Sequence, residues 1–106
     1  MYSVVRIGDK DVALLATGAT PYRYNNVFHA DIFKEMTSIE DGAAAYMIMQ
    51  LAYVMAKAAD KADMNTLNMD DFYSWLDQFG PNDIAEAAPE IMDVYNGSMK
   101  GEISPK

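Results

Sequence analysis

One stretch limits the possible folds more than any other: residues 38–63, SIEDGAAAYMIMQLAYVMAKAADKAD, whose pattern predicts one continuous helix. Ser38, followed three residues later by Asp41, gives a start similar to a capping box. Within residues 43–56 the only polar side-chain group besides the tyrosine hydroxyls is the Gln50 amide. At about 100° per residue, one face is wholly apolar; it carries Ile48, Leu51, Ala52, Met55 and Ala59. A helix with so little polar surface is usually covered on most sides, either by its own chain or by a partner.

This stretch is too short to cross a membrane. Its apolar run, about 14 residues, falls short of the roughly 20 that a spanning helix needs. The N-terminal sequence MYSVVRIGDKD also lacks the basic start and the long apolar region of a signal peptide. We therefore expect a soluble, cytoplasmic protein.

The composition argues against several classes of function. A net charge of −8 disfavours binding to nucleic acid or to an anionic membrane. The chain has no cysteine, which excludes metal sites with thiolate ligands. Its single histidine cannot form a histidine-rich metal site. The acidic stretch 60–71 fails the EF-hand pattern: counted from Asp63, positions five, six and twelve hold Leu67, Asn68 and Ser74. No glycine-rich phosphate loop or hydrolase motif is present. We expect no enzyme activity, no cofactor and no metal.

The N-terminal segment predicts a β-hairpin. Residues 2–7 (YSVVRI) and 11–16 (DVALLA) are apolar runs suited to strands, and Gly8-Asp9-Lys10 between them supplies turn residues. Two strands alone are marginally stable in water, so the hairpin must pack on helices or on another subunit. Its unpaired edges could also pair with a neighbouring chain.

Four further helices are predicted around the long one. Thr20-Pro21 is a typical helix start, and Asn68 and Gly80-Pro81 mark a start and a stop further along the chain. Pro89 predicts a break near residues 87–88. The expected ranges are 21–30, 32–37, 69–79 and 82–95.

These elements predict a mainly α fold: a small helical bundle around one long central helix, with a short N-terminal hairpin. We expect a single domain over residues 1–106. It comprises the hairpin at 2–16, the bundle at 20–96 and a flexible polar tail at 97–106.

Several short motifs follow one another along the chain. The segment ATGATPYRY supplies Ala16, Thr17, Thr20, Pro21, Arg23 and Tyr24, and is followed by Phe28, Asp31 and Ile32. LAYVMAK at 51–57, Trp75-Leu76-Asp77 with Phe79, and Pro89–Ile91 come later. Over about residues 2–95 the chain resembles the tail assembly chaperones of long-tailed bacteriophages (Siphoviridae) of Gram-positive bacteria. One departure is His29, where the family often has glycine.

The resemblance implies a host-cytoplasmic chaperone that is absent from the mature virion. It would bind the tape measure protein, a long, helical, apolar chain, and keep it soluble until tail-tube subunits assemble around it. The tail-tube protein is a further candidate partner, and weak homo-oligomerisation is expected. The alternatives are a helix-binding adaptor or regulatory module, and a structural tail or connector subunit.

A partner surface is predicted beside the narrow polar side of the long helix. Methionine is flexible and suits surfaces that accept varied partners, and the chain has nine of them. Tyr46, Met49 and Tyr53 border the polar residues of the helix, and Met47 lies on its other flank. Phe72 and Trp75 either extend this surface or belong to the core.

Overall fold

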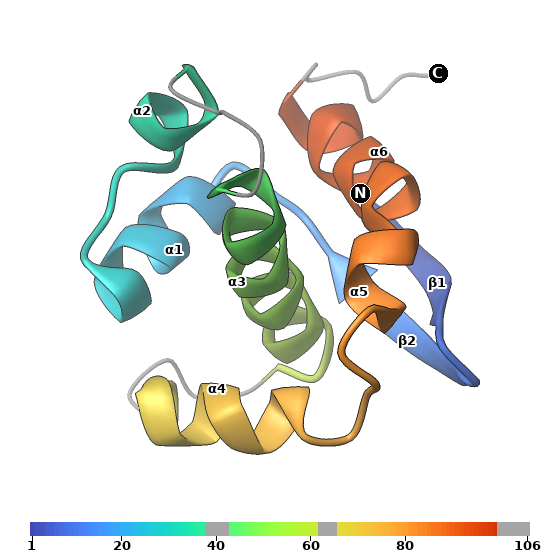
Figure 1. The fold of residues 1–106 in the computed structure, drawn as a ribbon. Coiled ribbons are helices and arrows are strands. Elements are labelled where there is room, and N and C mark those ends of the chain that lie inside the picture. The colour runs from blue at the N-terminus through green and yellow to red at the C-terminus, as the bar shows by residue number, and fades with distance from the viewer. Residues whose placement is uncertain (38–42, 62–65, 100–106) are drawn as a thin grey trace.

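The computed structural model describes residues 1–37, 43–61 and 66–99 of the 106-residue chain (Figure 1). These residues form a two-stranded antiparallel sheet and six helices. In chain order the elements are β1 (Tyr2–Ile7), β2 (Lys10–Leu15), α1 (Thr20–Phe28), α2 (Ile32–Thr37), α3 (Ala43–Ala59), α4 (Met69–Leu76), α5 (Asp83–Glu86) and α6 (Ala88–Met99). None of the helices in the described ranges is long and apolar enough to cross a membrane.

The predicted N-terminal hairpin is confirmed. Strands β1 and β2 pair from Tyr2 opposite Leu15 to Ile7 opposite Lys10. Gly8, with φ of 65°, supplies the left-handed backbone of the turn, which residues with a side chain rarely adopt. One face of the sheet is buried and the other is exposed, as the alternation of side chains along a strand requires. The buried face carries Val5, Ile7 and Leu14, and the exposed face carries Tyr2 and Val4.

The ATGATP segment forms the joint between the hairpin and α1. The backbone N–H of Thr17 donates to Thr20 Oγ1 (2.8 Å), and the Thr20 N–H donates back to the carbonyl of Thr17 (3.0 Å). Ala16 and Thr20 are buried, and Pro21 occupies the first turn of α1. This closed turn explains why small residues, hydroxyls and a proline occur in this order.

The prediction of a bundle around one long helix is wrong. Helix α3 has 17 residues and ends at Ala59, and Lys61 has a left-handed φ of 58°. The chain therefore turns before residue 63, the predicted end, while residues 38–42 and 62–65 lie outside the described residues. The other helices have between 4 and 12 residues. Asp60 and Lys61 are polar and exposed. A further helical turn there would therefore bury little apolar surface and would add little stability.

The hairpin and the helices contribute to one common core. Helix α3 packs against β2 and against helices α1, α5 and α6, so the buried sheet face and several helices share one core (Figure 1). All six side chains from Leu51 to Ala56 are buried. Nearer the start of α3, Tyr46 is 70% exposed. The covering of α3 is therefore complete from Leu51 to Ala56 and incomplete at Tyr46.

Of two predictions for the C-terminal region, one is confirmed and the other is wrong. The predicted break near residues 87–88 is confirmed, because α5 ends at Glu86 and α6 begins at Ala88, with Pro89 in its first turn. The predicted helix end at Asn96-Gly97 is wrong, because α6 continues to Met99. A side chain at position 97 would collide with the Met1 thioether. This glycine thus permits close packing of the N-terminus, and does not stop the helix.

His29 ends α1 in a conformation that favours glycine. Its φ is 55°, and its N–H donates to the carbonyl of Asn25 (2.7 Å). The side chain is exposed, as expected from its position at a helix end. A left-handed residue at this place is a common helix terminator, which is consistent with a glycine at the corresponding place in the resembled family.

Candidate functional site

The six residues predicted to bind a partner do not form one surface. Tyr46 is 70% exposed and Met49 is half-buried. The other four, Met47, Tyr53, Phe72 and Trp75, are all buried, with at most 9% of each exposed. For Phe72 and Trp75 the core alternative is therefore correct. For Met47 and Tyr53 the prediction of a free surface is wrong.

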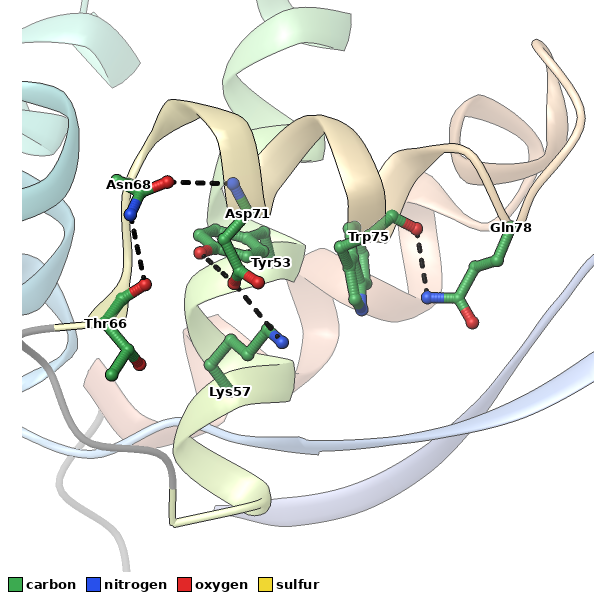
Figure 2. Close-up of polar contacts among 7 residues, drawn as sticks. All are labelled: Tyr53, Lys57, Thr66, Asn68, Asp71, Trp75 and Gln78. Carbon is green, nitrogen blue, oxygen red and sulfur yellow. Dashed lines mark hydrogen bonds and ion pairs between the residues drawn. The ribbon is translucent and has the colours of Figure 1, made fainter.

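Helix α4 is the reason why Tyr53 is buried. It crosses the second half of α3, and its apolar face covers the Tyr53 ring (Figure 2). The ring centroid of Tyr53 lies 5.2 Å from that of Phe72, 5.8 Å from that of Trp75 and 6.1 Å from that of Phe28. These tilted and edge-on contacts are favourable geometries for aromatic side chains. They join α1, α3 and α4 into one aromatic cluster.

A polar contact completes this crossing. The Tyr53 hydroxyl donates to Asp71 Oδ2 (2.6 Å), and Lys57 Nζ lies 3.3 Å from the same oxygen (Figure 2). The Asp71 N–H in turn donates to Asn68 Oδ1 (2.9 Å), which confirms Asn68 as the cap of α4. Burial, with the Asp71 hydrogen bond, raises the pKa of Tyr53 well above its usual range. The Tyr53 hydroxyl, with Lys57, lowers the pKa of the Asp71 carboxyl. The arrangement fastens α4 to α3.

Tyr53→Phe should make the protein less sensitive to acid. Asp71 has a lower pKa in the folded chain than the ordinary 3.8, so its ionised form stabilises the fold above that pH. This contribution is lost as the pH falls through the lowered pKa. Removing the hydroxyl should cost about 1 kcal/mol near neutral pH and less at lower pH. Urea unfolding between about pH 6 and about pH 3 measures the difference. Tyr22→Phe, at an exposed tyrosine, is the control, and equal slopes for both variants would contradict the assignment.

An apolar groove lies beside Met49. It has a volume of about 230 Å³ and runs between α3 and the connection from α4 to α5. Its lining residues are Met49, Leu76, Asp77, Phe79, Gly80, Pro81 and Ile84. The connection is held in place by a hydrogen bond from the Gly80 N–H to Asp83 Oδ2 (2.7 Å). Tyr46 lies one turn before Met49 on the same side of α3, at a spacing that makes the two residues neighbours.

Most of this groove was missed by the sequence-based prediction. Of its lining residues, only Met49 was predicted to bind a partner, while Leu76, Asp77 and Phe79 were motif residues and Gly80-Pro81 marked a helix stop. The available signal was the presence of large apolar residues on both sides of Gly80-Pro81, because a turn between them can leave an open apolar edge.

The groove suits apolar side chains of a partner better than a small molecule. Its volume, about 230 Å³, is below the roughly 300–1,000 Å³ typical of small-molecule pockets. An exposed tyrosine next to a methionine-lined depression is a surface that can receive one or two apolar anchors.

Comparison of the chain with models of protein families, with curated proteins and with solved structures finds no match.

Proposed function

We propose that this chain is a non-enzymatic tail assembly chaperone that binds helices of the tape measure protein and keeps them soluble. The observation that carries the proposal is the apolar groove beside Met49, next to the 70% exposed side chain of Tyr46. Tyr46 and Met49 are the two residues of the predicted partner surface that are accessible to a partner.

The chemistry of the groove fits a partner of varied sequence. A long helical chain presents a different set of apolar side chains in each segment, so one closely shaped pocket could not bind all of them. Met49 has three rotatable bonds and a polarizable sulfur, and it can adjust to different anchors. Tyr46 adds a large contact area with few side-chain torsions to order.

The charge of the chain supports the same function. Asp77 lies in the groove lining, and the whole chain carries a net charge of −8. A partner coated with several such chains would acquire strong negative charge, and this repulsion would keep coated complexes apart.

The motifs behind the resemblance provide separate support. Ala16 and Thr20 are buried in the turn that joins the hairpin to α1, and Tyr24 is buried while its hydroxyl donates to Gln50 of α3 (2.7 Å). The rings of Trp75 and Phe79 meet edge-on, with centroids 5.0 Å apart. The motif residues thus hold α1 and α4 in place beside α3, whose Met49 lines the groove.

Co-expression with the tape measure protein tests this function. We expect the tape measure protein to be soluble with this chain and aggregated without it. A single peptide bound at one-to-one stoichiometry, with no effect on solubility, would instead indicate the adaptor. Retention in assembled particles would indicate the structural subunit. Weak self-association stays a separate prediction, which light scattering over a wide concentration range checks.

A further inference from the structure

Strand β1 has one edge that is not paired. The Ala16 N–H donates to the carbonyl of Met1 (2.8 Å), and the Met1 amino group donates back to Ala16, so these two residues form a hydrogen-bonded pair. In an antiparallel ladder such pairs alternate with non-bonded ones. Tyr2, Val4 and Arg6 therefore direct their backbone N–H and C=O groups away from β2. Among the described residues, none of these groups bonds to another element.

This edge borders an open groove. The groove has a volume of about 400 Å³ and lies between β1 and α6. On the strand side it is lined by Met1 and residues 3–6, and on the helix side by Glu90, Asp93 and Val94. Val94 is buried, while Glu90 and Asp93 are exposed. The unpaired edge of β1 thus faces a wall that carries two carboxylates.

We propose that this groove binds an extended segment of a partner protein, added as a third strand beside β1, in which basic and apolar residues alternate. Residues of the added strand opposite Ser3 and Val5 would point toward α6, where Glu90 and Asp93 attract lysine or arginine. The intervening residues would point to the other face, beside the exposed side chains of Tyr2 and Val4, which are 61% and 55% exposed. Backbone bonds would provide affinity, and the alternation would provide selectivity.

A second copy of this chain fits the groove poorly. Pairing of two β1 strands would bring the α6 helices of both copies to the same groove and would set their Glu90 and Asp93 carboxylates near each other. Arg6 is the only basic residue of β1, and it lies on the exposed face, 3.1 Å from Asp11. The strand therefore offers the acidic wall of a second copy no side-chain cation that is not already paired. Charge complementarity favours a basic partner.

A short peptide tests the proposal on the full-length chain. The probe is an acetylated, fluorescently labelled peptide of alternating valine and lysine, and the control peptide has glutamate in place of lysine. We expect the lysine peptide to bind, as measured by anisotropy, and the glutamate peptide to bind at least about tenfold more weakly. The amide protons of Val4 and Arg6 should become protected from exchange when the lysine peptide is bound.

Two variants locate the binding. Val4→Pro removes an N–H from the open edge, where proline is tolerated, and Ala13→Pro is the matched change on β2. Glu90→Gln with Asp93→Asn removes the acidic wall, and Glu86→Gln with Asp70→Asn is its charge-matched control at exposed sites. Val4→Pro and the wall variant should each weaken binding about tenfold, while the controls should change it little. If Val4→Pro fails to fold by circular dichroism, the wall variant decides.

Three results would overturn the proposal. They are the absence of binding at millimolar peptide, binding that neither variant weakens, and a dimer by light scattering that Val4→Pro dissociates. The last result would assign the edge to a second copy.

Discussion

Tyr53→Asp should unfold the domain. The Tyr53 side chain is fully buried among Phe28, Phe72 and Trp75, and its hydroxyl donates to Asp71. Aspartate would replace the ring by a smaller, charged group and would place a second carboxylate beside Asp71. A buried charge without a partner costs about 3–5 kcal/mol. Loss of the buried aromatic ring adds about 3–5 kcal/mol. The sum is comparable with the roughly 5–15 kcal/mol that stabilises a typical domain.

Circular dichroism and thermal unfolding measure this effect. The prediction from the sequence that Tyr53 belongs to a partner surface is corrected by the burial of this side chain. Tyr46→Asp, at a tyrosine on the same helix that is 70% exposed, is the matched control and should keep the native spectrum. A folded Tyr53→Asp variant with an unchanged thermal midpoint would show that α4 does not cover α3.

Leu51→Ala should destabilise the fold by about 2–5 kcal/mol, because it leaves a cavity in a close-packed core. Leu51 has no exposed surface, and the residues that follow it in α3, from Ala52 to Ala56, are buried as well. The surrounding elements come from both the sheet and the helices, so the site has little freedom to collapse around the missing atoms.

Urea unfolding followed by fluorescence of the single tryptophan, Trp75, is a suitable measurement. Phe33→Ala is the control, because it removes a larger side chain that is 49% exposed and should cost less than about 1 kcal/mol. A loss below about 1 kcal/mol for Leu51→Ala would contradict the assigned orientation of α3 in the core.

Local signals accounted for much of the fold. The turn residues around Gly8 place the hairpin, Asn68 caps α4, and Pro89 separates α5 from α6, because each acts on the backbone within a few residues. The end of α3 was missed, because Ala59, Asp60 and Lys61 include no glycine or proline. The left-handed residue that stops the helix is a lysine.

The candidate site depended on contacts between distant segments. Tyr46 and Tyr53 occupy equivalent positions beside the polar residues of α3, and the sequence gives no reason to separate them. The crossing of α4 buries Tyr53 and leaves Tyr46 exposed. The groove beside Met49 likewise requires Phe79 and Ile84 to come close to α3, which depends on the turn between α4 and α5.

The proposed role of the Met49 groove can be tested through the solubility of the partner. Tyr46→Asp with Met49→Asp places two charges at the groove and avoids the fully buried residues of the core. Tyr22→Asp changes a tyrosine that is 71% exposed on α1 and is the matched control. Circular dichroism establishes that each variant is folded, and Tyr46→Asp with Met49→Gln replaces the double variant if it is not.

The most direct measurement is the soluble fraction of the tape measure protein co-expressed with each folded variant. With the wild-type chain or Tyr22→Asp, the tape measure protein should remain in the supernatant. With the groove variant it should pellet as it does alone. A folded groove variant that still keeps the tape measure protein in solution would contradict the assignment of this groove as the chaperone surface.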